Sequence, residues 1–148
     1  MDKKYTCYCG LYCENCSVRA KINPAAKVLY NEMKAAGFDE IVQFIPGGDS
    51  FWPFLKDMAE NGTCISCREG SGNPNCAVRI CAENKGIEMC AFCDSYPCEL
   101  FTDFLKGYPI LENDNALLRE QGYDAWFKLQ DERRAKGFVY QQARSSSF

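Results

Sequence analysis

Hydrophobic positions along this chain recur every three to four residues, which is the spacing of amphipathic helices, and seldom alternate as strands require. The first long stretch follows Asn23-Pro24, a good helix start because asparagine can cap and proline lacks the N–H that a first turn leaves unpaired. Gly37 is expected to stop this helix. We expect its core-facing side chains to be Ala25, Val28, Leu29, Met33 and Ala36.

Similar apolar stretches follow. A short one runs from Asp39 to Ile45 and ends at Pro46-Gly47-Gly48. Ser50 is expected to cap the next helix, whose predicted core residues are Trp52, Leu55 and Met58. Helical spacing then returns towards the C-terminus at Leu100 to Leu105 ahead of Gly107, at residues 116–120, and at residues 123–134 ahead of Gly137.

Residues 61–98 have a different composition, rich in cysteine and glycine. Short metal-bound loops have this composition, since glycine lets backbone N–H groups turn toward thiolate sulfurs. No alternation of strands and helices appears, which argues against a doubly wound sheet. The pattern predicts a mainly α fold with little β structure: a single domain over residues 1–148, whose small helical core carries cysteine-rich metal-binding loops of the zinc-ribbon or knuckle type at residues 61–98.

The chain contains 11 cysteines and no histidine, and this limits its chemistry. Without histidine, a Ser-His or Cys-His nucleophilic centre is excluded, and no catalytic residue is predicted. A net charge of −3 without a long run of either sign gives no reason to expect nucleic acid or an anionic membrane as a partner. No run approaches the roughly 20 apolar residues of a membrane helix, and no signal peptide is evident, so we expect a cytoplasmic protein.

The cysteines fall into spaced groups, which in a reducing cytoplasm indicates metal binding in preference to disulfides. Each Cys-X-X-Cys pair presents two thiolates from one turn, and two such turns supply the four soft ligands of tetrahedral zinc. We therefore predict about two zinc ions held by cysteine alone. Cys7 lies outside these groups and is not expected to bind metal, so its replacement by serine should be nearly silent. The candidate ligands are Cys9, Cys13, Cys16, Cys64, Cys67, Cys76, Cys81, Cys90, Cys93 and Cys98.

Spacing leaves open how these cysteines divide between sites. One arrangement joins Cys64 and Cys67 to Cys90 and Cys93, and leaves Cys9, Cys13 and Cys16 with one of Cys76, Cys81 or Cys98. Another groups Cys64, Cys67, Cys76 and Cys81, and gives Cys90, Cys93 and Cys98 a ligand from the amino-terminal group. Because residues five apart do not share one face of a regular helix, at most one of Cys76 and Cys81 is expected to bind from such a helix.

Iron–sulfur clusters are the main alternative to zinc, because cysteine thiolates hold them too and Cys9-X3-Cys13-X2-Cys16 has a ferredoxin-like spacing. Such a protein would serve electron transfer or redox chemistry. A third hypothesis is a thiol-disulfide oxidoreductase, which requires metal-free protein with one low-pKa cysteine. Zinc sites filled by four sulfurs leave no position for water, which favours structural metal in a protein of interaction or regulation over an enzyme. A protein partner fits that role, and the oligomeric state is left open.

Two arginines, Arg68 and Arg79, stand inside the cysteine-rich segment, where a guanidinium could offset thiolate charge or contact a partner. Near the C-terminus, Arg133, Arg134 and Lys136 are expected only to complement the dipole at the end of the last long helix.

Several motifs in fixed order characterise the chain: CGLYCENC near the start, CISCREGSGNPNCAVRICAENKG followed by CAFCDSYPC, and the closing QDERRAKGFVY. Together they resemble the prokaryotic family called domain of unknown function 3795. The resemblance implies a small cytoplasmic cysteine-rich protein, suspected of binding zinc, with no established reaction. The ten candidate cysteines occupy the family's cysteine positions, and Cys7 is an addition to them.

Overall fold

The computed structural model describes residues 2–144, which are mostly helical. Over these residues no strand forms, and an isolated antiparallel bridge joins Thr6 to Tyr12. The predicted mainly α fold is therefore confirmed. None of the helices in this part of the chain is both long and apolar enough to cross a membrane. The α-helices are α1 (Asn23–Ala35), α2 (Phe38–Ile41), α3 (Gly48–Glu60), α4 (Ala77–Lys85), α5 (Glu99–Gly107) and α6 (Ile110–Ala135).

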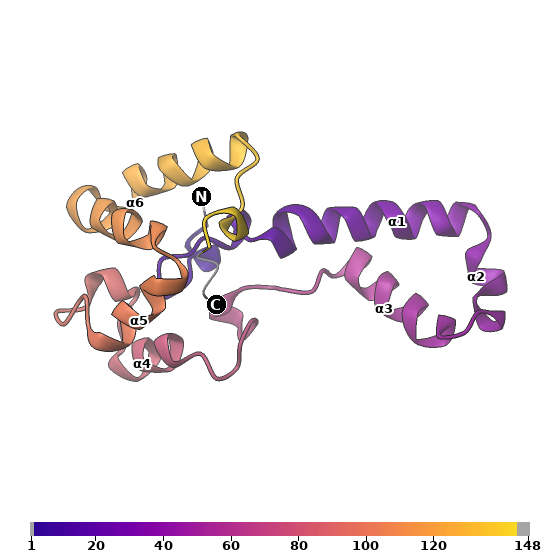
Figure 1. Cartoon of the computed structure of the whole chain (residues 1–148), viewed down its shortest axis with the longest axis horizontal. Helices are drawn as coiled ribbons and strands as arrows, with labels where there is room; N and C mark the ends of the chain where they lie inside the picture. Colours follow the sequence, from indigo (N-terminus) through magenta and orange to yellow (C-terminus); the bar gives the residue numbers. More distant parts are fainter. Residues whose placement is uncertain (1, 145–148) are drawn as a thin grey trace. The chain divides into compact units, whose positions relative to one another are not determined.

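The chain divides into two compact units (Figure 1). The hairpin unit, Ser17–Cys64, contains α1, α2 and α3. The cysteine unit consists of the residues up to Cys16 and those from Ile65 onward, and it contains α4, α5 and α6. Every cysteine except Cys64 belongs to the cysteine unit. The prediction that residues 1–148 form a single domain stays a prediction.

In the hairpin unit, α1 and α3 run side by side (Figure 1). The predicted helix start is confirmed, with Pro24 in the first turn of α1. The predicted core face of α1 is wrong at its centre, because Val28 and Leu29 are 62% and 47% exposed. Ala26 and Tyr30 are buried instead. Periodicity identified the helix, but the position of α3 decided which stripe of α1 is covered.

The start of α3 also differs from its prediction. Its N-cap is Gly47, not Ser50, which lies inside the helix. Gly47 adopts the left-handed conformation, with φ 79° and ψ 0°, that glycine accepts without strain. The next residue, Gly48, lies so close to the backbone carbonyl of Val42 that a Cβ would collide with it. The turn into α3 therefore requires the glycine pair, and the capping preference of serine is overridden.

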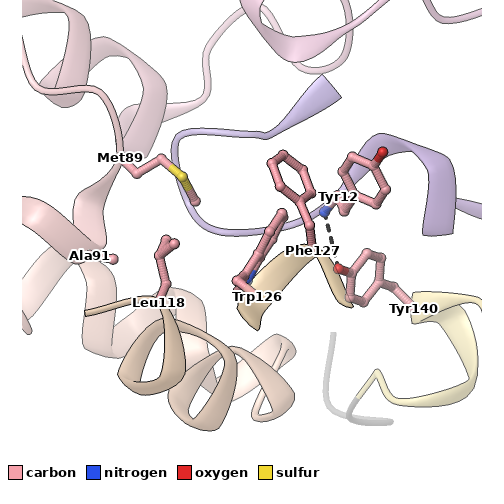
Figure 2. Close-up of a cluster of buried hydrophobic side chains, with 7 residues drawn as sticks. All are labelled: Tyr12, Met89, Ala91, Leu118, Trp126, Phe127 and Tyr140. Atoms are coloured by element: carbon pink, nitrogen blue, oxygen red, sulfur yellow. Dashed lines mark hydrogen bonds between the residues drawn. The ribbon is translucent and has the colours of Figure 1, made fainter. Parts of the chain in front are cut away.

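The core of the cysteine unit surrounds the fully buried Trp126 (Figure 2). The ring centroids of Tyr12 and Phe127 lie 5.6 and 5.2 Å from that of Trp126, both in edge-on arrangements. The hydroxyl of Tyr140 accepts a 3.0 Å hydrogen bond from the backbone N–H of Tyr12, drawn dashed in Figure 2. The core thus fastens the first cysteine motif to α6 and to the segment that follows it. Met89, Ala91 and Leu118 complete the buried cluster.

The two amphipathic stretches predicted near the C-terminus are the two halves of α6. They are separated at Gly122, whose φ of 77° and ψ of −173° are not helical. Figure 1 shows the halves as distinct helical segments. The break allows residues of the first half to meet residues of the second.

A buried polar network joins the two halves of α6 across this break. Asp114 is fully buried and accepts two hydrogen bonds from the guanidinium of Arg133, at 2.5 and 2.8 Å. Gln130 donates to Asp114 at 3.1 Å and accepts from Asn15 and from the Tyr140 hydroxyl, each at 2.9 Å. The expectation that Arg133 only complements a helix dipole is therefore wrong, because its ion-pair partner lies 19 residues earlier in sequence.

Candidate metal centre

Buried neighbours hold the Cys-X-X-Cys turn at Cys90 and Cys93. Met89 and Ala91, on either side of Cys90, are both inserted in the core and are 0% and 1% exposed. The turn closes with a 3.0 Å hydrogen bond from the Cys93 N–H to the Cys90 carbonyl. A further bond of 2.7 Å, from the Cys90 N–H to the Tyr8 carbonyl, attaches it to the amino-terminal cysteine motif. The backbone therefore fixes where these thiols can reach.

Four cysteines line one cavity of about 20 Å³ in the cysteine unit: Cys81, Cys90, Cys93 and Cys98. Cys81 projects from α4, and Cys98 is the N-cap residue of α5. The other two belong to the turn between these helices. Segments spread over 18 positions of the sequence thus supply four sulfurs to one small space. We call this set the cavity thiols.

The cavity is largely apolar, with Val78, Ile87 and Phe101 among its lining residues. Burial raises the pKa of the Cys90 thiol to about 12, and the neighbouring cysteines add to the shift. Cys93 also borders a more open hollow of about 220 Å³ beside Asp94 and Arg119.

Cys7 lies close to another cysteine in the fold. The sequence places it outside the spaced motifs and predicts that it binds no metal, which stays a prediction, but in the fold its Sγ lies 3.6 Å from the Sγ of Cys13. Hydrogen bonding to Cys13, and then to Cys67 and Cys9, raises the pKa of the Cys7 thiol well above its usual value, and burial adds to the effect. Cys7 thus contacts Cys13, and its pKa is also affected by Cys9 and Cys67. We call these four cysteines the amino-terminal thiols.

The pKa of Cys67 shifts in the opposite direction to that of Cys7. Hydrogen bonding from Cys7 lowers the pKa of Cys67 to about 6, although burial opposes the change. The backbone N–H of Tyr8 and the guanidinium of Arg79 also interact with the Cys67 sulfur and lower its pKa. Within this pair, the pKa of Cys7 is therefore raised and that of Cys67 is lowered.

The two arginines of the cysteine-rich segment bind backbone carbonyl groups. Arg79, only 7% exposed, donates to the carbonyls of Ser71 and Asn73, each at 2.9 Å, and to that of Cys67 at 3.4 Å. Arg68 donates to the carbonyls of Thr6 at 2.8 Å and Glu88 at 2.6 Å. Both side chains hold loops in place, and Arg79 also offsets the charge of a thiolate.

Neither sequence arrangement places Cys81 and Cys98 together with Cys90 and Cys93, as the cavity does, and the division of the ten cysteines between metal sites stays a prediction. Cys90 and Cys93 share their cavity with Cys81 and Cys98, while Cys67 contacts Cys7. Cys76 is the N-cap of α4 and is not among the residues lining the cavity. Cys9 and Cys13 are both buried.

The remaining two candidates stand outside both sets. Cys16 ends a 3-10 turn, where its N–H donates to the Cys13 carbonyl at 3.0 Å. Cys64 closes the hairpin unit, and its carbonyl accepts a 3.1 Å hydrogen bond from Arg19. Over residues 2–144, no group of three or more cysteine or acidic side chains is already arranged to hold a metal ion.

Comparison with known proteins gives one match. A family model described as "Protein of unknown function (DUF3795)" matches residues 5–103. The matched region includes all 11 cysteines and ends inside α5, so the closing QDERRAKGFVY lies outside it. No curated protein and no solved structure matches the chain.

Proposed function

Because the chain belongs to the DUF3795 family of proteins of unknown function, its role has to be inferred from its own thiols, and we propose that it is a zinc-binding protein with all-cysteine structural sites. The observation that carries this proposal is the cavity lined by Cys81, Cys90, Cys93 and Cys98. Four sulfur donors are the ligand set of structural zinc sites, and thiolates are the soft ligands that zinc accepts.

The size of the cavity supports an ion over a larger ligand. A volume of about 20 Å³ accommodates roughly one water-sized occupant. An organic substrate or cofactor needs a pocket of roughly 300 Å³ or more. The thiols do not already form a tetrahedron, so the proposal requires side-chain rotation on binding, as in sites where metal binding is coupled to folding.

Zinc in this cavity would act as a cross-link. It would join α4, the turn at Cys90–Phe92 and Cys98, the residue before α5. Four sulfur ligands would leave no coordination position for water, so the ion would support structure and not hydrolysis. We propose that the protein serves interaction or regulation in the cytoplasm, with its helical surface available to a protein partner.

Metal analysis of protein purified anaerobically under reducing conditions tests the proposal. We expect a colourless protein that contains zinc and lacks iron, because zinc is d10 and absorbs no visible light. Brown protein with iron and acid-labile sulfide would contradict the proposal and support the iron–sulfur alternative. Folded protein without any transition metal would contradict both and leave thiol-disulfide chemistry.

The chain offers a matched pair of variants for the cavity. Cys76 and Cys98 are both N-cap residues with extended backbone, and neither makes a side-chain capping hydrogen bond. Serine is a better N-cap than cysteine, so Cys76→Ser should keep its zinc and gain about 0.5 kcal/mol in the free energy of unfolding. Cys98→Ser gains the same cap but loses a ligand. It should therefore release one zinc equivalent and melt at a lower temperature.

Zinc content by mass spectrometry and melting by circular dichroism distinguish the two variants. Equal zinc content in Cys76→Ser and Cys98→Ser would show that the cavity is not a metal site. Loss of zinc from Cys76→Ser alone would show that α4 presents its other cysteine to the metal.

A further inference from the structure

We propose that the hairpin unit pairs with the hairpin unit of a second copy of this chain, so that two α1–α3 hairpins form an antiparallel four-helix bundle. The pairing surface is one side of the hairpin, which we call the apolar face. It consists of Ile22, Ala25 and Leu29 on α1 and of Phe51 and Phe54 on α3. The inference goes beyond the proposed function and does not depend on it, because the apolar face contains none of the cavity thiols.

Helix α1 carries two apolar stripes. One contains Ala26 and Tyr30 and is buried in the core of the hairpin unit. The other contains Ile22, Ala25 and Leu29, which recur at three and four residues and are exposed. Ile22 and Ala25 stand four and one residues before Ala26, and Leu29 stands three residues after it. At about 100° per residue, all three are rotated from the buried stripe in the same sense.

Helix α3 repeats this arrangement. Its buried residue is Leu55, and Phe51 and Phe54 stand four and one residues before it. The spacing equals that of Ile22 and Ala25 before Ala26, so the exposed stripe of α3 is rotated from its buried stripe in the same sense as on α1. The two phenylalanines are 41% and 59% exposed.

The two exposed stripes lie on the same side of the hairpin because α1 and α3 are antiparallel (Figure 1). Asn23, at the start of α1, accepts a 3.2 Å hydrogen bond from the hydroxyl of Thr63, which follows α3. Further along α1, the ring of Tyr30 lies 4.9 Å from that of Trp52, near the start of α3. A rotation in the same sense about two antiparallel axes turns both stripes to one side of the pair. Together they form a continuous apolar surface.

The opposite side of the hairpin is charged. Lys27 and Lys56 directly follow Ala26 and Leu55, and Lys34, Asp49 and Glu60 fall on the same side as these two lysines. All five side chains are exposed. The hairpin therefore has one face suited to water and one that is not. Two helices packed on one another bury only the stripe between them, and a second apolar face requires another layer.

Exposed apolar side chains are concentrated in this unit. Over the residues that the structure describes, the hairpin unit carries most of the large apolar residues that are exposed. Besides those of the apolar face, they include Val28, Ile41, Phe44 and Ile45. Proteins that remain monomeric rarely expose large contiguous apolar patches, and such patches mark interaction sites.

The charges of the unit favour a second copy as the partner. Basic residues outnumber acidic ones in the stretch that ends with α1, whereas acidic residues outnumber basic ones in α2 and α3. The basic stretch contains Arg19, Lys21, Lys27 and Lys34 against Glu32, and the acidic stretch contains Asp39, Glu40, Asp49, Asp57 and Glu60 against Lys56. The hairpin is therefore complementary in charge to itself, as an interface formed by the same surface on both copies requires.

Charge also decides how the two copies are arranged. A two-fold axis parallel to the helices places α1 of each copy on α3 of the other, so that basic helices lie on acidic ones. Neighbouring helices are then antiparallel throughout, as in up-and-down four-helix bundles. A two-fold axis across the helices would instead place α3 on α3, with like charges opposed.

Sedimentation velocity of the full-length protein under reducing conditions, over a range of concentrations, tests the pairing. Wild-type protein should sediment with twice the mass of one chain. Leu29→Glu and Phe54→Glu should each raise the dissociation constant of the dimer about 100-fold or more, because the two-fold axis places each new charge in the apolar interface twice. Both side chains are about half exposed, so the variants should keep the helical circular dichroism of the wild type.

Ile80→Glu is the matched control. Ile80 is an aliphatic residue on α4 that is 44% exposed, close to the 47% of Leu29, but it lies in the cysteine unit. This variant should dimerise as the wild type does. Wild-type protein that stays monomeric at every concentration would overturn the inference. Equal weakening of the dimer by Ile80→Glu and Leu29→Glu would place the interface elsewhere and would overturn it too.

Salt tests the arrangement of the two copies. Attraction between α1 of one copy and α3 of the other is screened by ions, so added sodium chloride should weaken the dimer. A dimer that becomes tighter with salt would overturn the placement of α1 on α3.

Metal content separates this inference from the proposed function. Leu29→Glu should be monomeric with the zinc content of the wild type, whereas Cys98→Ser should lose zinc and remain dimeric. A metal-free wild-type protein that still dimerises through Leu29 would end the zinc proposal and leave the pairing of the hairpins standing.

Discussion

At the scale of single residues, polar side chains that look ordinary in the sequence hold the cysteine unit together. Asn15 lies between two cysteines of the first motif and donates to the side chain of Gln130 at 2.9 Å. Gln130 in turn binds Asp114 and Tyr140. These partners are buried, so each hydrogen bond that is lost leaves a polar group without water to replace it.

The ion pair between Asp114 and Arg133 should therefore contribute strongly to stability. Asp114→Asn removes the charge while keeping the shape, and we expect a loss of about 2–3 kcal/mol in the free energy of unfolding. The side chains of Asp114 and Arg133 are 0% and 19% exposed, so water screens the pair weakly. Guanidinium chloride denaturation measures the change.

An exposed pair on the same helix supplies the control. Asp131 and Arg134 also form an ion pair, but their side chains are 43% and 49% exposed. Asp131→Asn should cost less than about 1 kcal/mol, since exposed ion pairs contribute little. Similar losses in Asp114→Asn and Asp131→Asn would show that the buried pair has no special role.

At the scale of elements, glycines decide where helices begin, break and end. Gly122 divides α6 with φ 77° and ψ −173°, a region that essentially only glycine occupies. Gly86 ends α4 with φ 64° and ψ 26°, a left-handed conformation that other residues adopt at a smaller cost. No atom lies within 4 Å of the position that a Cβ would take at either site, so substitution tests backbone strain alone.

Replacement of these two glycines by alanine should lower the free energy of unfolding by different amounts. Gly122→Ala should lower the free energy of unfolding by about 2–3 kcal/mol, because the ε region excludes a side chain. Gly86→Ala should cost only about 1 kcal/mol. If Gly122→Ala were neutral by chemical denaturation, then α6 would be able to pass this residue as a continuous helix.

At the scale of the whole molecule, the two units should respond differently to metal removal. The hairpin unit has a buried cluster of its own, formed by Ala26, Tyr30 and Leu55. The hairpin unit contains one cysteine, Cys64, which is its last residue. Its helices therefore need no metal to stay packed, whereas the proposed zinc site lies in the cysteine unit.

Hydrogen exchange with and without a chelator tests this difference. On metal removal, amide protons should exchange faster in the loops around Cys90–Cys93 and Cys98, because metal binding is coupled to the order of its ligands. Protection of α1 and α3 should be unchanged. Equal loss of protection in α1 and in the cysteine loops would contradict the separate stability of the units.

The amino-acid pattern by itself determined the class of fold and the chemistry on offer. Apolar spacing placed α1, α5 and the two halves of α6, because each helix must bury one stripe of its surface. The absence of histidine excluded Ser-His and Cys-His nucleophilic centres, and the number and spacing of the cysteines pointed to metal-binding thiols. The apolar spacing and the cysteine motifs can both be recognised from residues a few positions apart in the sequence.

Tertiary structure alone decided which side chains meet. It exposed Val28 and Leu29 because α3 lies against the neighbouring stripe of α1. It brought the Sγ of Cys7 to 3.6 Å from the Sγ of Cys13. It also gathered Cys81 and Cys98 with the turn between them. Spacing tells which thiols one turn can present, but partners far apart in sequence are chosen by packing, since the chain folds to bury Met89, Ala91 and Trp126 together.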